Sequence, residues 1–209
     1  MRITKDRETR RAEIIGTAIA LFLEKGYADT MVSDIVKRVG VAQGTFYYYF
    51  RTKEDVLDAA LEQLLREGVE RVARLAADDC QTASVRLEGL FRMLFSPRGS
   101  IEVDARYRGL LQDQSVHARM EAVRFRMLHG VLSDLIGAGI RYGEFRRLRF
   151  PSEAAEIALK GASAFMRERH MPLVAADTML DALAEFMENL LGMPEGALNF
   201  KDRVIRIRA

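Results

Sequence analysis

Two glycines divide the first fifty residues into three short segments, and this spacing constrains the fold more than any other feature. Residues 8–25 carry apolar side chains at helical spacing, and Gly26 is placed to end that helix. Thr30 is a candidate N-cap for a second, short helix, which Gly40 ends. A third helix is expected over about residues 43–50. Helix, short helix, glycine-containing turn and short helix is the order of a helix-turn-helix motif.

The expected third helix contains five aromatic residues in succession. At roughly 100° per residue, Phe46 and Phe50 share one face, which we expect to pack against the first two helices. Tyr47, Tyr48 and Tyr49 then point outward or sideways. Exposed phenols suit DNA, because a phenol donates to a phosphate while its ring contacts a thymine methyl. The alternative is an ordinary helical hairpin with half-buried tyrosines, since such shapes also occur in proteins that do not bind DNA.

Three residues next to the aromatic run are also suited to contact DNA. Gln43, near the helix start, presents an amide that can read a base edge. Gly44 lets the backbone approach a ligand closely, and Lys53, just past the helix, can neutralise a phosphate.

The charge distribution favours an anionic partner for the N-terminal part only. Residues 1–53 hold ten Lys and Arg against six acidic residues, whereas the remainder has a net charge of −2. Such an excess also serves solubility alone. The arm from Arg2 to Arg11 is either a disordered charged tail or a segment in which Arg2 and Lys5 reach a minor groove or phosphates.

The rest of the chain favours long helices. Only four prolines occur, and period-two apolar runs are lacking before the tail. The expected helices cover about residues 54–76, 82–95, 102–114, 117–142, 151–169 and 175–192. The sequence therefore predicts an all-α protein of about nine helices, with a helix-turn-helix domain at 1–53, a larger helical domain at 54–194 and a tail at 195–209. The tail is either frayed or a short added strand.

Several classes of protein are disfavoured. The single cysteine, Cys80, excludes an intrachain disulfide framework and fits a cytoplasmic location. The chain shows neither an apolar membrane span nor a signal peptide at its N-terminus. His117, His129 and His170 lack partners at metal-binding spacing, so no metal, cofactor or catalytic residue is predicted and the protein is not expected to be an enzyme.

Residues 8–57 resemble the DNA-binding domain of the TetR family of bacterial transcription regulators. The resemblance is carried by Gly26-Tyr27, Thr30, Asp34-Ile35, Gly40-Val41, the run from Gly44 to Phe50, and Lys53-Glu54. It is strong over about a quarter of the chain, and the remainder matches only as a divergent all-helical domain.

The resemblance implies roles for individual residues in DNA binding. Bases or the groove would be faced by Ser33, Gln43, Gly44, Thr45 and Tyr47, and the DNA backbone would be held by Thr30, Tyr48, Tyr49 and Lys53. Two positions depart from the family pattern. Ala42 stands where the family often has Ser, which removes an N-cap, and Val36 replaces a common Ala.

The resemblance also implies that the larger domain binds a small, partly apolar effector. The candidate lining residues combine apolar bulk with a few polar tips, and they are Phe91, Tyr107, Met127, His129 and Phe165. The many methionines of this domain are equally typical of an ordinary adaptable core.

The last two expected helices are candidates for a homodimer interface, although each is also compatible with intrachain packing. Small residues allow close helix approach on one, and a wide apolar stripe runs along the other. The interface residues predicted are Ala158, Gly161, Ala162, Phe165, Met179, Leu183, Phe186, Met187 and Leu190.

Together with the TetR resemblance, these features predict a homodimeric repressor that binds a palindromic DNA operator. The resemblance further implies that a small molecule releases it by tilting the helix at 54–76. The alternatives are a ligand-independent regulator or activator, and a helical ligand-binding protein whose helix-turn-helix is vestigial.

Overall fold

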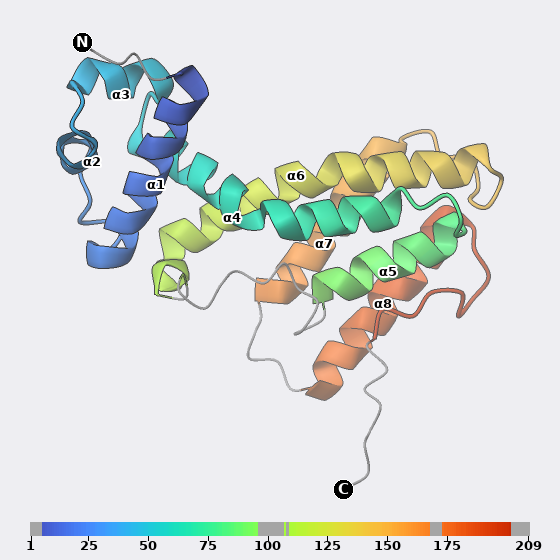
Figure 1. The fold of residues 1–209 in the computed structure, drawn as a ribbon. Coiled ribbons are helices and arrows are strands. Elements are labelled where there is room, and N and C mark those ends of the chain that lie inside the picture. The colour runs from blue at the N-terminus through green and yellow to red at the C-terminus, as the bar shows by residue number, and fades with distance from the viewer. Residues whose placement is uncertain (1–5, 96–106, 108, 168–172, 202–209) are drawn as a thin grey trace, which may run out of the picture. The chain divides into compact units, whose positions relative to one another are not determined.

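The computed structural model describes residues 6–95, 107, 109–167 and 173–201, and these are helical throughout apart from turns and loops (Figure 1). The prediction of an all-α fold is confirmed. The helices are α1 (Arg7–Lys25), α2 (Val32–Val39), α3 (Gln43–Tyr49), α4 (Lys53–Ala76), α5 (Ala83–Phe95), the short 3-10 helix η2 (Leu110–Gln112), α6 (Gln114–Arg141), α7 (Pro151–Arg167) and α8 (Leu173–Leu191).

Most expected helix bounds agree with the structure within a few residues. The expected helix at 102–114 falls largely outside the described residues, and its described end is η2. The helix α6 begins at Gln114, three residues earlier than predicted, because Asp113 caps it: its carboxylate accepts from the backbone N–H of Ser115 at 2.8 Å and of Val116 at 3.4 Å. Of the arm predicted from Arg2 to Arg11, the part from Arg7 onward forms the first turn of α1 and is not a disordered tail, whereas residues 1–5 lie outside the described residues, as does the end of the tail at 202–209.

The chain forms two compact units, each of which packs within itself. The first unit groups Met1–Arg66 with Val103–Arg124, and the second groups Glu67–Glu102 with Phe125–Ala209. The helices α4 and α6 therefore each contribute to both units. The functional division predicted after residue 53 stays a prediction.

The first unit has a core formed where α1, α2 and α3 converge. The apolar stripe predicted on α1 is buried, and it meets Ile35 and Val36 of α2 and Phe46 of α3 in a continuous apolar interior. Gly40 ends α2 in the left-handed conformation, with a φ of 74°, which a residue with a side chain rarely adopts.

The prediction of Thr30 as the N-cap of α2 is wrong. The N-cap is Met31, whose backbone N–H donates to the Asp34 carboxylate at 2.9 Å. The Thr30 hydroxyl is fully buried and instead donates to the carbonyl oxygen of Gly26 at 2.7 Å. Thr30 therefore closes the loop between α1 and α2 on the side of α1.

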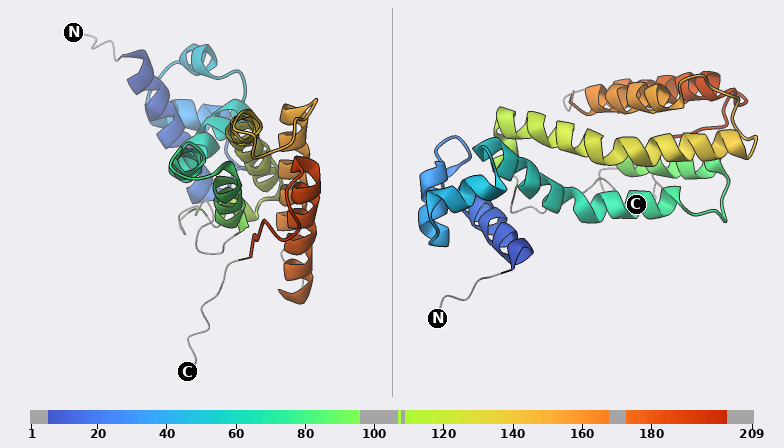
Figure 2. Two further views of the ribbon diagram at one scale, coloured as in Figure 1. Left: turned by 90° about the vertical axis from the view of Figure 1, so that its right-hand side faces the viewer. Right: turned by 90° about the horizontal axis from the view of Figure 1, so that it is seen from above.

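The second unit packs α7 against α8 alongside α5 and the later turns of α6 (Figures 1 and 2). Gly139 is required there, because a Cβ at this position would lie 2.2 Å from the Phe145 ring. The Glu144 carboxylate accepts from the backbone N–H groups of Ala83 and Ser84 at 2.9 and 3.2 Å, which caps α5 from 60 residues away.

Candidate nucleic-acid interface

The five consecutive rings of α3 divide into buried and exposed sets as the helical period predicts. Phe46 is 0% exposed and Phe50 is 4% exposed, whereas Tyr47 and Tyr48 expose 50% and 66% of their surface. Tyr49 is half-buried. The phenylalanines therefore fix the helix, and the tyrosines leave polar-tipped rings on its outer side.

Two arginines of α1 lie over rings of the α3 region. The Arg7 guanidinium is 5.4 Å from the centroid of the Tyr48 ring, and the Arg11 guanidinium is 5.3 Å from that of Phe50. Such cation–π contacts contribute about 0.5–1 kcal/mol at exposed sites. The Arg7 contact and the edge-on packing of Tyr49, at 5.0 Å, orient the exposed Tyr48 ring. Sequence reasoning missed this role of Arg7, because the partner lies 41 residues away.

The start of α3 is open. Its N-cap is Ala42, which makes no side-chain capping bond, as the departure from the family pattern predicts. Gln43 and Gly44 are exposed, and Thr45 is half-buried. A Cβ built on Gly44 would meet no atom within 4 Å, so packing inside the subunit does not require glycine there.

Two residues predicted to bind DNA, Lys53 and Thr30, make hydrogen bonds within or to the loop between α1 and α2. Lys53 donates from Nζ to the carbonyl oxygens of Tyr27 and Ala28, at 2.8 and 3.3 Å, and lies 4.3 Å from the centroid of the Tyr27 ring. An ammonium has three donors, so one stays available for a phosphate. Thr30 has no such reserve, since its buried hydroxyl donates within the loop.

Tyr27 joins the end of α1 to the start of α4. Its hydroxyl donates to Glu54 Oε1 at 3.0 Å, and its ring packs edge-on against Phe22 at 5.2 Å. Burial, and then the bond to Glu54, raise the pKa of Tyr27 to about 12, so the phenol is neutral at physiological pH.

Ion pairs on the surface hold α2 against α1, while Ser33 on α2 stays exposed. Arg38 donates from both terminal nitrogens to the Glu24 carboxylate at 2.8 and 2.9 Å, and Lys25 pairs with Asp34. The bond from Arg38 lowers the pKa of Glu24, and the bond from Lys25 lowers the pKa of Asp34. These pairs join α2 to α1, and Ser33 lies on the same helix as Asp34 and Arg38.

Comparison with known proteins finds relatives of this N-terminal region. Residues 14–60, which span α1 to the early turns of α4, match the family described as "Bacterial regulatory proteins, tetR family". A fatty acid metabolism regulator protein of Bacillus subtilis is 37% identical over 68 residues, which cover 32% of this chain and 35% of the relative. The N-terminal part of the chain is therefore similar to the tetR family, and the chain spans about a third of the length of this relative.

A second relative extends the TetR-family likeness beyond the first helices. The HTH-type transcriptional repressor KstR2 of Rhodococcus jostii is 25% identical over 171 residues, covering 75% of this chain and 81% of the relative. The crystal structure of RolR in complex with resorcinol shares the fold, with a TM-score of 0.63 and 23% identity over 94% of this chain and 95% of that one.

The effector-pocket residues predicted from the TetR resemblance belong to both units. Phe91 is buried and stacks on Phe200 at 4.7 Å, and the His129 ring lies 3.2 Å from the carbonyl oxygen of Ser152. Met127 and Tyr107 are half-buried, but Tyr107 belongs to the first unit. The side chain of Phe165 lies outside the described residues. The pocket therefore stays a prediction.

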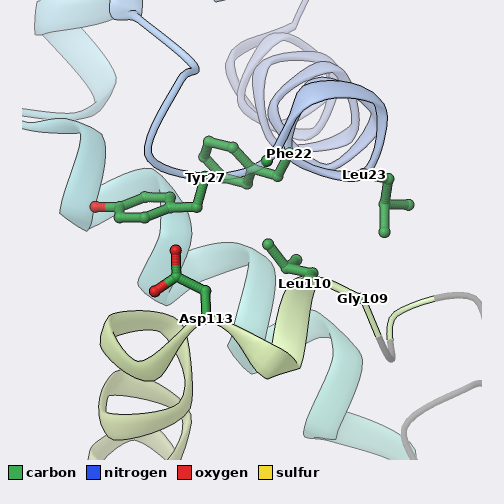
Figure 3. A pocket seen from close by; sticks show the side chains of 7 residues that line it. Phe22, Leu23, Tyr27, Gly109, Leu110 and Asp113 are labelled. Atoms are coloured by element: carbon green, nitrogen blue, oxygen red, sulfur yellow. The ribbon is translucent and has the colours of Figure 1, made fainter.

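A cavity of about 290 Å³ lies in the first unit, for which the sequence analysis made no pocket prediction (Figure 3). The end of α1 forms one wall, and the turn ahead of α6 forms the other. It is lined by Phe22, Leu23, Gly26, Tyr27, Gly109, Leu110 and Asp113. These residues come from segments far apart in the sequence, so local periodicity gave no signal for the cavity.

The predicted dimer residues divide by exposure. Ala158, Ala162 and Met187 are buried within the subunit, whereas Met179 and Phe186 expose 44% and 43% of their surface. Leu183 and Leu190 are half-buried and Gly161 is exposed, and the side chain of Phe165 is again outside the described residues. Ile157 of α7, which the sequence prediction omitted, is 58% exposed. The interface stays a prediction.

Within the described part of the chain, no group of three or more His, Cys, Asp or Glu side chains is placed to hold a metal ion. None of the helices there is long and apolar enough to cross a membrane. Cys80 is free and exposed.

Proposed function

We propose that this protein is a sequence-specific DNA-binding transcription regulator that acts in the cytoplasm without enzymatic activity. The observation that supports the proposal best is the division of α3: Phe46 is fully buried while Tyr47 and Tyr48 stand half or more exposed. A helix fixed on one side and lined with phenols on the other suits the major groove, which admits an α-helix. The TetR-family sequence at residues 14–60 supports the same reading.

Within this proposal the exposed residues divide between bases and backbone. Gln43, at the open start of α3, offers an amide to a base edge, and Gly44 lets the helix backbone come close. Ser33, Thr45 and Tyr47 face the groove from the two helices, whereas Tyr48 and Tyr49 hold phosphates. Lys53 contributes its one uncommitted donor. Thr30 acts indirectly, by fixing the loop ahead of α2.

The regulator works as a homodimer on a palindromic operator in this proposal. The apolar side chains that α7 and α8 leave exposed, Ile157, Met179 and Phe186, supply the contact between subunits. Two copies of α3 then enter successive major grooves about 34 Å apart.

Without its effector, the protein binds the operator and represses transcription. A small, partly apolar molecule that binds to the protein releases it from the operator. The structural neighbour RolR, which shares the fold, was crystallised with resorcinol. Binding in the larger domain tilts α4, and a coupling of about 1–3 kcal/mol between the two sites is typical of such regulation.

Selection from random DNA duplexes tests the proposal. The protein should enrich a palindromic sequence, and its affinity for that duplex should fall steeply with salt. Gln43→Ala should change the sequence preference, and Tyr48→Ala should weaken binding to all sequences. Tyr142→Ala is the matched control, because Tyr142 is 67% exposed but lies beyond α6. Equal losses in Tyr48→Ala and Tyr142→Ala would contradict the assigned interface.

A reporter gene placed behind the selected operator separates repression from activation. Repression should disappear when the regulator carries Tyr48→Ala and persist with Tyr142→Ala. Increased reporter expression with the unaltered protein would identify an activator.

A further inference from the structure

Two acidic residues one helical turn apart on α4 accept hydrogen bonds from two different parts of the chain, the loop after α1 and the helix α6. Glu54 and Asp58 are separated by four residues and so share one face of α4. Glu54 accepts the hydroxyl proton of Tyr27 at 3.0 Å, which ties α4 to the end of α1. Asp58 accepts from Arg119 Nε of α6 at 2.7 Å. One face of α4 therefore connects the DNA-binding helices to α6.

The contact between Arg119 and Asp58 is partly shielded from solvent. The two side chains expose 37% and 26% of their surface, and the pair joins positions 61 residues apart. The bond to Asp58 raises the pKa of Arg119 above its usual value. The side chains of Val116, Met120 and Val123 are buried beside it on α6 and fix this part of the helix.

The packing of the chain places this part of α6 with the DNA-binding helices. Residues up to Arg124 belong to the first unit, and α6 continues from Phe125 into the second. The turn ahead of α6 also meets the end of α1, where Asp113 and Leu110 line the cavity opposite Phe22 (Figure 3). The start of α6 is therefore bound to α4 by the Arg119–Asp58 pair, and the turn ahead of it faces the end of α1 across the cavity.

We propose that Arg119 is a positioning residue for DNA binding, which acts by holding α6 to Asp58 and thereby sets the orientation of the three N-terminal helices. This inference rests on the proposed function and adds a residue outside the helix-turn-helix to it. Arg119 does not touch DNA in this arrangement. A displacement of α6 is carried by Arg119 to α4 and, through Glu54 and Tyr27, to α1.

The test compares operator affinity among Arg119→Gln, Arg119→Asp, Asp58→Arg and the double exchange of the two charges. Arg119→Gln should weaken binding by about twofold to fivefold, the range expected for a part-exposed ion pair. The single charge reversals should weaken it further, and the double exchange should restore most of the affinity. Thermal unfolding of each variant identifies any loss that comes from misfolding.

Two further measurements separate positioning from direct contact. The slope of log affinity against log salt should equal that of the unaltered protein in every variant, because no phosphate contact is lost. On duplexes in which the half-site spacing changes by one base pair, Arg119→Gln should discriminate less between spacings. Arg124→Gln is the matched control, since its ion pair with Glu121 lies within α6 and connects no second helix.

Clear outcomes would overturn the inference. A salt slope that falls by about 0.9 in Arg119→Gln would make Arg119 a phosphate ligand. A folded double exchange that binds as weakly as the single reversals would show that the pair does not couple the helices. Failure of the unaltered protein to bind any selected duplex would instead reject the proposed function, and this inference with it.

Discussion

Two surfaces that expose large side chains, one on α3 and one on α7 and α8, differ in one chemical respect. On α3 the exposed rings are Tyr47 and Tyr48, each with a hydroxyl at its tip, whereas α7 and α8 expose Ile157, Met179 and Phe186, which have no polar atoms able to donate. A hydroxyl-tipped ring stays hydrated when unbound and binds a phosphate when bound. A purely apolar side chain gains only from another apolar surface. Under the proposed function, the chemistry of the side-chain tips, more than the exposed area, determines which partner each surface binds.

The largest effect is expected where a buried ring of α3 is removed. Phe46→Ala should lower the free energy of unfolding of the first unit by about 3–5 kcal/mol, because Phe46 is fully buried and its removal leaves a cavity. Denaturant titration measures this loss. Tyr48→Ala on the same helix should change stability by less than about 0.5 kcal/mol, and a comparable loss there would contradict the division between buried and exposed rings.

A charge placed among the exposed apolar residues of α8 should have the next largest effect. Phe186→Lys should weaken self-association at least tenfold, because a cation would be buried without a partner at the proposed interface. Analytical ultracentrifugation measures the change. Val85→Lys provides the control, since Val85 is 52% exposed on α5 and outside that interface. Unchanged association in Phe186→Lys would exclude this surface from the dimer.

Removing only the hydroxyl tips should have a moderate effect confined to DNA. Tyr47→Phe with Tyr48→Phe should weaken operator binding by about tenfold, given about 0.5–1.5 kcal/mol for each lost hydrogen bond. Fluorescence anisotropy with labelled duplex measures it, and the unfolding midpoint should not move. If the double variant binds like the unaltered protein, the rings act by stacking or shape, and the hydroxyl groups do not distinguish this surface from the apolar one on α7 and α8.

The smallest effect concerns pH and the ion pairs between α1 and α2. The pKa values of Glu24 and Asp34 are lowered by Arg38 and Lys25 from ordinary values of 4.5 and 3.8. Their stabilisation is therefore complete above those ordinary values and is lost as the pH falls through the lowered ones. Both groups are on the surface, so the change is small and screened by salt. The unfolding midpoint of Glu24→Gln should change less with pH in the acidic range than that of the unaltered protein. An identical pH dependence would show that the pair of Glu24 with Arg38 does not stabilise the fold.

Local periodicity accounts for what the sequence predicted well. The burial of Phe46 and Phe50 and the exposure of Tyr47 follow from the helical repeat alone, and Gly26 and Gly40 end helices where expected. These features depend on neighbours within four residues, which the sequence displays directly.

Long-range contacts account for what the sequence did not predict. The bond from Thr30 to Gly26, the pairing of Arg119 with Asp58 and the cavity beside Tyr27 depend on how separate helices pack. Thr30 was expected to cap α2, because threonine before a short helix usually does, but the loop conformation turned its hydroxyl inward. Periodicity carries no information on such pairings.

The open surroundings of Gly44 have a consequence for how such a regulator changes over generations. No atom lies within 4 Å of a side chain added there, and the neighbouring Gln43 is also exposed. Replacing a helical glycine with alanine even favours the helix, by roughly 1 kcal/mol. On the proposed interface, a gene duplicate can therefore acquire a new DNA target at these two positions while its fold is preserved, so that the operators available, and not stability, limit the divergence between copies.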